Sequence, residues 1–368
     1  MGKCQNCGKE YNAISQFLGL CRSCILQDFK SVEPLIQEAH LTSREAYGLP
    51  PSPPKDEGGI SCGYCFNRCR MGKGESGYCG VRIQGEGGKV GPPPKQGIFS
   101  WYYDPLPTNC VASWICPGGT GAGFPKYAYS RTAEYGYKNL AVFYYGCTFN
   151  CLFCQNWVFR EGLRERRPQP SLELSQVVDR WTSCICYFGG DPSPQLPHSI
   201  HASRLALAQK QNRILRVCWE TNGSMNSRFL EEILEIALES GGCVKFDLKT
   251  FNSNLNVALC GRLNEQTKAN FELAAGWTKK RKDPPLVMAS TLLVPGYIER
   301  EEVYQIAKFI AALDREIPYS LLGFYPHFYF EDLPCTSRRH AQECRQAALE
   351  AGLSRVNIGN IHLLGKEY

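Results

Sequence analysis

Residues Leu140–Cys154 read Leu-Ala-Val-Phe-Tyr-Tyr-Gly-Cys-Thr-Phe-Asn-Cys-Leu-Phe-Cys. The first half is an apolar and aromatic run that ends at Gly146, which predicts a buried strand. The three cysteines that follow have the spacing C-x3-C-x2-C. A compact loop of this kind can place thiolates on separate irons of a cubic four-iron cluster and leave one iron open to a small chelating molecule. Buried free thiols, or a zinc site with three ligands, are the alternative interpretations of the same cysteines.

The sequence on either side of this loop predicts an α/β fold. From about residue 136 onward, short apolar runs alternate with amphipathic segments at helical spacing. Such alternation is typical of a parallel sheet with right-handed crossovers, and about seven units favour a partial or full β/α barrel. The chemistry of such a barrel lies at the carboxyl ends of its strands, so the motifs are expected there. The predicted strands are 140–146, 184–189, 213–220, 243–248, 286–294, 320–325 and 355–359, and the predicted helices are 172–183 (N-cap Ser171), 198–211, 227–240, 264–277, 299–315 and 337–351.

The cysteine loop resembles the signature of the radical SAM superfamily, down to the aromatic Phe153 before its last cysteine. Residues from about 136 to 330 are similar to relatives of the pyruvate formate-lyase activating enzymes. The resemblance implies that Cys147, Cys151 and Cys154 hold a [4Fe-4S] cluster that donates an electron to S-adenosylmethionine (SAM). It also implies cleavage of SAM to methionine and a 5′-deoxyadenosyl radical that abstracts hydrogen from a substrate, with a small redox protein as electron donor.

Two segments at the ends of later strands resemble segments near the SAM site of that family. The first is similar to Gly-Gly-Glu-Pro, with Asp191 where most relatives have glutamate, and its glycines allow the backbone to approach a ligand closely. The second resembles Asp/Glu-Thr-Asn-Gly. An ordinary turn after a strand is the alternative for each. The residues implied to contact SAM are Gly189, Gly190, Asp191, Pro192, Glu220, Thr221 and Asn222.

Three further residues are candidates for catalysis by resemblance. Asp247 and Lys249 match the Asp-x-Lys of the family at the end of the fourth predicted strand, although such a pair can be purely structural. His327 follows the sixth strand in an aromatic-Pro-x-His segment, although a lone histidine more often has a structural role. Five residues before Pro295 stands Ser290, where activating enzymes have an arginine that assists substrate binding. This departure weighs against a glycyl-radical enzyme as the substrate.

A first additional set of cysteines has the paired spacing of a zinc ribbon or treble clef. A module this small cannot fold on its apolar residues alone, so a metal is expected to stabilise it. Zinc is the expected ion, and a rubredoxin-like iron site is the alternative. The set is Cys4, Cys7, Cys21 and Cys24.

A second additional set resembles the segment that precedes the barrel in radical SAM relatives associated with Memo-like proteins. Four cysteines within 18 residues can hold zinc or an auxiliary iron–sulfur cluster, and the spacing leaves both possibilities open. The set is Cys62, Cys65, Cys69 and Cys79.

The other cysteines carry weaker signals. Cys110 and Cys116 are expected either to ligate a further site or to reach into the barrel mouth. Four others lie on or beside predicted strands and are expected to be small buried hydrophobes; they are Cys184, Cys186, Cys218 and Cys243.

Composition, net charge and Pro- or Gly-rich stretches indicate the class of protein and its domain boundaries. Twenty cysteines in 368 residues, without an apolar signal core near Met1, indicate metal binding in a reducing cytoplasm rather than a secreted disulfide scaffold. No apolar run is long enough to cross a membrane, and the net charge of +6 identifies no partner. The expected domains are a ribbon-like module at 1–30, a helix and Pro-rich linker at 31–59, a Cys/Gly-rich accessory segment at 60–135 and the barrel at 136–368.

The sequence therefore predicts a radical SAM enzyme whose substrate is a protein, a small molecule or RNA. A glycyl-radical-enzyme activase that acts on a protein partner is the first alternative, with the N-terminal module as its docking element. The alternative from another class is a non-catalytic metal-binding or electron-carrier protein on the same barrel. That alternative leaves the three-cysteine loop and the Gly-Gly-Asp-Pro segment without a purpose.

Overall fold

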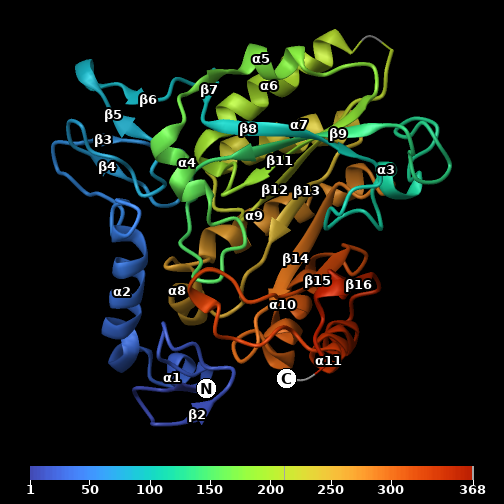
Figure 1. Ribbon diagram of the computed structural model, residues 1–368. Helices are drawn as coiled ribbons and strands as arrows, with labels where there is room; N and C mark the ends of the chain where they lie inside the picture. Colours follow the sequence, from blue (N-terminus) through green and yellow to red (C-terminus); the bar gives the residue numbers. More distant parts are fainter. Residues whose placement is uncertain (211, 367–368) are drawn as a thin grey trace.

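A curved sheet of eight strands organises the chain in the computed structural model, which describes residues 1–210 and 212–366 (Figure 1). The order is β16-β15-β14-β13-β12-β11-β9-β8, parallel throughout except for the antiparallel edge strand β8. Within the described residues β16 and β8 do not pair with each other, so the barrel is partial. The strands are β8 (Phe99–Pro105), β9 (Lys138–Tyr144), β11 (Thr182–Gly189), β12 (Arg216–Thr221), β13 (Val244–Asp247), β14 (Val287–Leu293), β15 (Tyr319–Gly323) and β16 (Val356–Gly359).

The seven predicted strands are all confirmed, and their ends differ from the prediction by a few residues at most. Strand β8 was not predicted. It lies at the edge of the sheet, and the side chains of Trp101, Tyr102 and Tyr103 are exposed one after another. The alternation of apolar and polar residues that reveals a half-buried strand is therefore missing from its sequence. Through β8, the segment expected to be accessory contributes to the main sheet.

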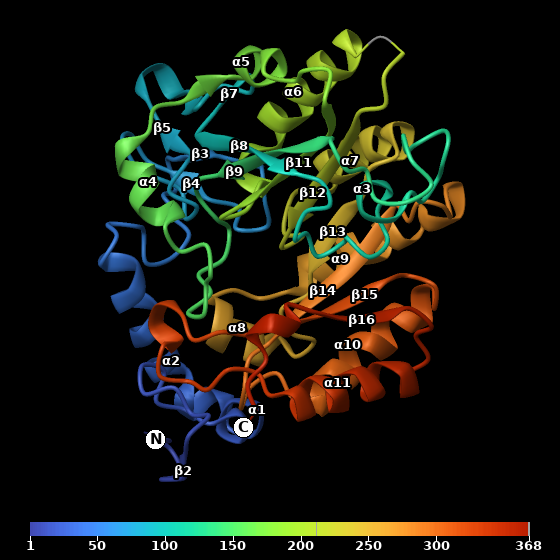
Figure 2. The ribbon, with the colours of Figure 1, turned by 45° about the vertical axis from the view of Figure 1, so that its right-hand side comes forward.

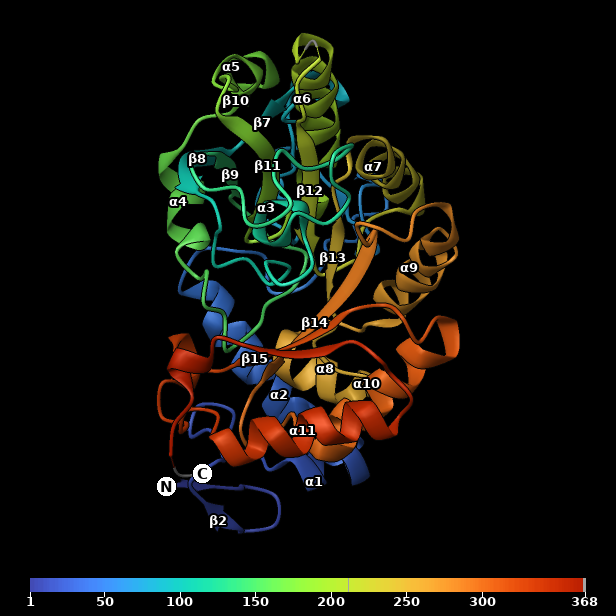
Figure 3. The same cartoon turned by 90° about the vertical axis from the view of Figure 1, so that its right-hand side faces the viewer.

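Helices follow one another around the outside of the curved sheet (Figure 3). The predicted helix 172–183 ends early, because β11 already begins at Thr182. Ser171 is the first residue of that helix rather than its N-cap, and its hydroxyl bonds His201. Two short helices, α4 and α8, were not predicted. The helices on the sheet and around it are α4 (Phe159–Glu165), α5 (Ser171–Gln176), α6 (Leu196–Gln209), α7 (Ser227–Ser240), α8 (Ser253–Cys260), α9 (Glu265–Ala275), α10 (Arg300–Leu313) and α11 (Arg338–Glu350).

The N-terminal segments pack where the parallel strands end. Helices α1 (Arg22–Gln27) and α2 (Phe29–Glu45) lie against α8, which follows β13 (Figures 1 and 2). The His40 Nε2 atom lies 3.0 Å from the carbonyl oxygen of Val257 in α8, and the Tyr297 hydroxyl donates to the carbonyl of Leu20 at 2.9 Å. These contacts place the N-terminal module (residues 1–30) and helix α2 over the carboxyl edge of the sheet. The short strands outside the main sheet are β1 (Gly2–Lys3), β2 (Glu10–Tyr11), β3 (Ile60–Ser61), β4 (Arg70–Met71), β5 (Ile83–Gln84), β6 (Val90–Gly91), β7 (Gln96–Gly97) and β10 (Gln169–Pro170).

A segment after β8 closes the opposite end of the barrel. It spans residues 106–137, includes α3 (Pro117–Thr120), and lies across the sheet from α2 (Figures 1 and 2). Trp114 Nε1 donates to the hydroxyl of Ser320 at 2.9 Å, near the start of β15. The buried guanidinium of Arg216, at the start of β12, makes paired bonds of 2.9 and 2.6 Å to the carboxylate of Glu134. We call this segment the barrel plug.

Among the described helices, none combines the length and the apolar character that a membrane-spanning helix requires.

Candidate active site and metal centres

The three-cysteine loop follows β9 and lines a pocket at the carboxyl edge of the sheet. Cys147, Cys151 and Cys154 all border this pocket. The backbone N–H of Phe149 donates to the Cys147 sulfur at 3.4 Å, and the Asn222 amide lies 3.8 Å from the same sulfur. Burial raises the pKa of the Cys147 thiol, so an ion that binds there must displace its proton. We name this space the cluster pocket.

Two glycines, the last residue of β11 and the one that follows it, allow the backbone to pack directly on this loop. The N–H of Gly190 donates to the carbonyl of Tyr144 at 2.9 Å, and the N–H of Asp191 donates to the carbonyl of Gly146 at 2.9 Å. A Cβ atom at Gly190 would lie 2.3 Å from the Gly146 oxygen, closer than atoms pack. Gly189 has φ +119°, a conformation that L side chains rarely adopt. Both glycines line the cluster pocket, so the backbone itself forms part of its wall.

Asp191 borders the same pocket, but hydrogen bonds within the protein engage its carboxylate. Its Oδ1 atom accepts from the Thr221 hydroxyl at 2.8 Å and from the N–H of Asn222 at 2.9 Å. Its Oδ2 atom accepts from the N–H of Ser193 at 3.0 Å. Burial raises the pKa of Asp191, and these donors oppose that shift. In this structure the carboxylate holds the end of β12 against the turn that follows β11.

Two ion pairs continue along the carboxyl ends of β12 and β13. Glu220 lies 3.3 Å from the ammonium of Lys245, and burial raises the pKa of Glu220 to about 7. Asp247 and Lys249 form a second pair at 2.8 Å, and both line the cluster pocket. The Ser290 hydroxyl donates to Asp247 at 2.5 Å, so a residue of β14 holds the carboxylate of this pair in place.

Of the residues predicted to hold the cluster, contact SAM or act in catalysis, two lie outside the cluster pocket. The ring of His327 accepts a hydrogen bond from Trp157 Nε1 at 3.1 Å, and the carbonyl of Pro192 accepts from the N–H of Gln195 at 2.8 Å. Neither residue is part of the pocket lining. The pocket unites the remaining predicted residues, namely Cys147, Cys151, Cys154, Gly189, Gly190, Asp191, Glu220, Thr221, Asn222, Asp247 and Lys249.

The thiols of the N-terminal module are arranged for a single metal ion. The sulfur atoms of Cys4, Cys7, Cys21 and Cys24 all lie within 4.8 Å of one another. Cys4 and Cys24 are 3.7 Å apart, and Cys7 and Cys21 are 3.8 Å apart. A tetrahedral zinc ion with Zn–S bonds of about 2.3 Å places its ligands about 3.8 Å from one another. The spacing of the four thiols is therefore that of a tetrahedral zinc site.

The second set of cysteines converges on its own small space. Cys62, Cys65, Cys69 and Cys79 line one pocket, and the N–H of Tyr78 donates to the Cys69 sulfur at 3.4 Å. This pocket adjoins the cluster loop, because a Cβ atom at Gly146 would lie 2.9 Å from the carbonyl oxygen of Cys79.

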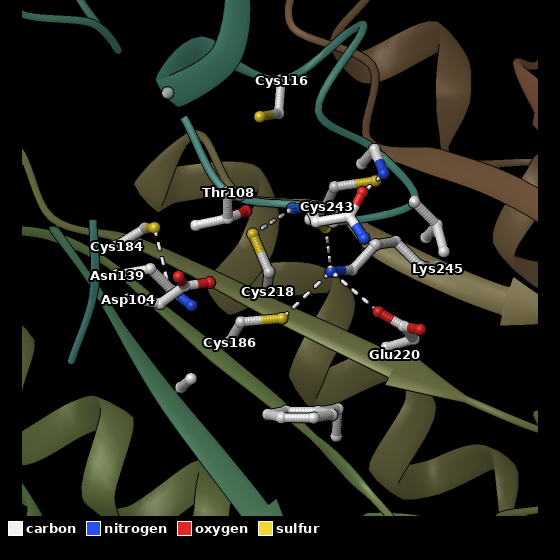
Figure 4. A pocket seen from close by; sticks show the side chains of 18 of the residues that line it. Asp104, Thr108, Cys116, Asn139, Cys184, Cys186, Cys218, Glu220, Cys243 and Lys245 are labelled. Atoms are coloured by element: carbon white, nitrogen blue, oxygen red, sulfur yellow. Dashed lines mark hydrogen bonds and ion pairs between the residues drawn. The ribbon is translucent and has the colours of Figure 1, made fainter. Parts of the chain in front are cut away.

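The interior of the barrel holds a cavity of about 510 Å³ between the cluster pocket and the barrel plug. Asn156, Phe188 and Glu220 line both the cavity and the cluster pocket, so the two spaces are neighbours. Lys245, which the sequence analysis did not single out, reaches into the cavity (Figure 4). Six cysteines also line it, including the four expected to be small buried hydrophobes; they are Cys110, Cys116, Cys184, Cys186, Cys218 and Cys243. We call them the cavity thiols.

The chain matches known proteins over this region. Residues 141–310 match the family model described as the Radical SAM superfamily. The uncharacterized protein MJ0808 of Methanocaldococcus jannaschii is 26% identical over 328 residues, which cover 83% of each chain. A second uncharacterized protein of that organism, MJ0674, is 22% identical over 57% of this chain and 60% of its own.

Solved structures resemble parts of the chain. Streptococcus suis SuiB bound to precursor peptide SuiA is 15% identical, covers 59% of this chain and 47% of its own, and has a TM-score of 0.46. A domain of pyruvate-formate lyase-activating enzyme from Bacteroides vulgatus is 20% identical over 48% of this chain and 98% of its own, with a TM-score of 0.37. A radical SAM methyltransferase from Sphaerobacter thermophilus is 17% identical over 60% of this chain and 66% of its own, with a TM-score of 0.44. The family match and the cysteine loop together assign a radical SAM domain to this chain, over residues 141–310.

Proposed function

We propose that the chain is an enzyme that cleaves SAM reductively at a [4Fe-4S] cluster and acts on a small molecule in the barrel cavity. One observation carries the proposal: the cluster pocket brings together three thiols, a glycine backbone and the ends of neighbouring strands, and it borders an internal cavity. A radical formed at this pocket would meet whatever occupies the cavity before it meets bulk water.

The residues of the cluster pocket fit the cluster and SAM. Cys147, Cys151 and Cys154 supply three soft ligands, and the N–H of Phe149 and the amide of Asn222 point at the Cys147 sulfur, as donors around cluster thiolates do. Gly189 and Gly190 leave room for a ligand against the backbone. When bound, the cluster and SAM supply an electron and a 5′-deoxyadenosyl radical. The protein positions both and excludes water.

A small substrate suits the shape of the site better than a protein does. The cavity of about 510 Å³ lies within the range of small-molecule sites, which is about 300–1,000 Å³. The barrel plug closes one end, and the N-terminal module packs over the other. Glu220 and Lys245 offer a charged pair at the boundary with the cluster pocket, where they can orient a polar substrate.

We also propose roles for the two additional cysteine sets and for the charged residues of the cluster pocket. We assign zinc to the N-terminal module, where it stabilises the fold, and a metal centre to Cys62, Cys65, Cys69 and Cys79. A small redox protein is the proposed electron donor. Asp247 and Lys249 are the proposed catalytic or SAM-contacting pair, because they line the cluster pocket, whereas His327 supports Trp157 from outside it.

The test uses the full chain, reconstituted with iron and sulfide without oxygen and reduced with dithionite. Wild-type protein is expected to convert SAM to 5′-deoxyadenosine and methionine, measured by liquid chromatography. The variant C147A/C151A/C154A is expected to fold, by circular dichroism, and to form neither product. Cys335→Ala removes a thiol outside the cluster pocket and serves as the matched control. Equal SAM cleavage by the triple variant would refute the proposal.

A second measurement separates the two substrate classes. A cell extract is separated by ultrafiltration into a small-molecule fraction and a macromolecular fraction. Each fraction is added to the reduced enzyme together with SAM. The small-molecule fraction is expected to increase the rate of 5′-deoxyadenosine formation. An increase with the macromolecular fraction alone would overturn the small-molecule assignment and favour the activase alternative.

A further inference from the structure

The cavity thiols on the sheet form one continuous patch. Cys186 and Cys218 are register partners on β11 and β12, so their side chains point to the same face. Cys184 precedes Cys186 by two residues and shares that face. Cys243 comes directly before β13, and its N–H lies 3.4 Å from the Cys218 sulfur. Two neighbouring strands and the residue before a third thus present thiols toward the interior of the barrel.

The barrel plug adds thiols from the opposite wall. Cys110 and Cys116 both line the cavity, although they lie far from the strand cysteines in the sequence. The hydroxyl of Ser320 donates to the carbonyl of Val111 at 2.9 Å, which fixes the plug beside Cys110. Figure 4 shows Cys116 reaching in from the plug, and Cys184, Cys186 and Cys218 facing the same space from the strands.

The polar groups of the cavity argue against a role in packing alone. Buried cysteines that act as small hydrophobes fill space among apolar neighbours. Here the ammonium of Lys245, which is 1% exposed, lies 3.0 Å from the Cys110 sulfur and 3.0 Å from the Cys186 sulfur. A buried ammonium in contact with two sulfurs places a positive charge where packing alone would place an apolar group. The same ammonium lies 3.3 Å from the carboxylate of Glu220, so one cation contacts two sulfurs and a carboxylate.

The number of thiols and the size of the cavity favour a cluster over a single ion. The four thiols of the N-terminal module, which all lie within 4.8 Å of one another, have the compact arrangement of a single-ion site. Six thiols from two opposite walls line the cavity instead. A cluster contacts each thiolate through a different iron, so its ligands stand farther apart than those of one ion. The cavity of about 510 Å³ also exceeds what a single ion needs.

We propose that the barrel cavity binds a second iron–sulfur cluster beside the barrel plug. Its ligands are a subset of the cavity thiols that includes Cys110 and Cys186. The cluster lies between the barrel plug and β11, and the substrate occupies the side of the cavity that borders the cluster pocket. Lys245 offsets part of its negative charge. This site goes beyond the proposed SAM chemistry, which needs only the cluster of the three-cysteine loop.

The test counts metal in a background that lacks the first cluster. Three variants carry C147A/C151A/C154A: the background itself, the background with C110A/C186A, and the background with C335A/C344A as a matched loss of two thiols outside the cavity. Each is reconstituted without oxygen, and iron, sulfide and zinc per chain are measured together with the electron paramagnetic resonance (EPR) spectrum after reduction. Because this background cannot cleave SAM, the result does not depend on the proposed function.

The proposal expects C110A/C186A to lose a whole cluster, about four irons and four sulfides for a cubane, while C335A/C344A matches the background. Metal at Cys62–Cys79 and in the N-terminal module contributes equally to all three variants. Equal iron and equal spectra in all three variants would overturn the proposal, and so would a loss of zinc in place of iron. Cys110→Ser changes one atom and is expected to alter the EPR spectrum even if the double variant does not fold.

Discussion

Replacement of Asp191 by asparagine is expected to weaken both the fold and the binding of SAM. The carboxylate is 2% exposed and accepts from Thr221, Asn222 and Ser193 at 2.8, 2.9 and 3.0 Å. An asparagine keeps one accepting oxygen, so its best orientation retains the bonds from Thr221 and Asn222. Its NH₂ group then faces the N–H of Ser193, and two donors meet without an acceptor.

The magnitude follows from these bonds. Hydrogen bonds to a charged group contribute roughly 1.5–3 kcal/mol each, and a buried donor left without a partner costs about 1–3 kcal/mol. Burial raises the pKa of Asp191, so desolvation already offsets part of what the carboxylate contributes. We therefore expect D191N to lower the free energy of unfolding by about 2–4 kcal/mol. D191E adds a methylene group to a filled site and is expected to cost about 1–3 kcal/mol.

The assay measures two quantities on the same samples. Urea titration followed by circular dichroism gives the free energy of unfolding, and equilibrium dialysis of the reconstituted protein gives the dissociation constant of SAM. Asp332→Asn is the control, because Asp332 accepts a hydrogen bond from Gln16 at an exposed position. If D191N bound no SAM but kept its stability within about 0.5 kcal/mol of wild type, Asp191 would be a direct ligand of SAM and our account of its role would be wrong.

Three further outcomes are expected. Gly190→Ala places a Cβ atom 2.3 Å from the Gly146 oxygen, so it should displace the cysteine loop and reduce the iron content, whereas Gly85→Ala, where the nearest atom is 3.7 Å away, should not. Cys7→Ser should release about one metal ion per chain and expose residues 1–28 to proteolysis. Full retention of that metal would contradict a metal site at the four N-terminal cysteines. Burial lowers the pKa of His198 to about 3, so its stabilising effect is complete above the unfolded pKa of about 6.5 and is lost as the pH falls. Between pH 7 and pH 5, wild type should therefore lose about 2 kcal/mol more unfolding free energy than H198Q, as urea titrations measure, and equal losses would contradict this.

The fold could be predicted from the sequence because its strands are buried on both faces. Runs such as Leu140–Gly146 are continuously apolar, and the polar motifs begin where such runs end. In a parallel sheet all strand ends meet at one edge, so Cys147, Gly189, Glu220 and Asp247 had to lie close together once the strands were identified. No further knowledge of register was needed to assemble the cluster pocket.

The cavity could not be predicted in the same way. Cys186 and Cys218 face each other only through the register of β11 and β12, and the sequence does not specify that register. Cys110 joins them through the barrel plug, which has no periodic pattern. The internal role of Asp191 was missed for a similar reason, because its partners Thr221 and Asn222 lie at the end of a neighbouring strand.

The central claim is that Cys147, Cys151 and Cys154 hold the cluster that binds SAM. The most direct measurement is the EPR spectrum of the dithionite-reduced protein before and after addition of SAM, for wild type and for C147A/C151A/C154A. We predict that SAM changes the signal of one cluster in wild type and changes nothing in the triple variant. An unchanged wild-type spectrum, or the same change in both proteins, would contradict the account.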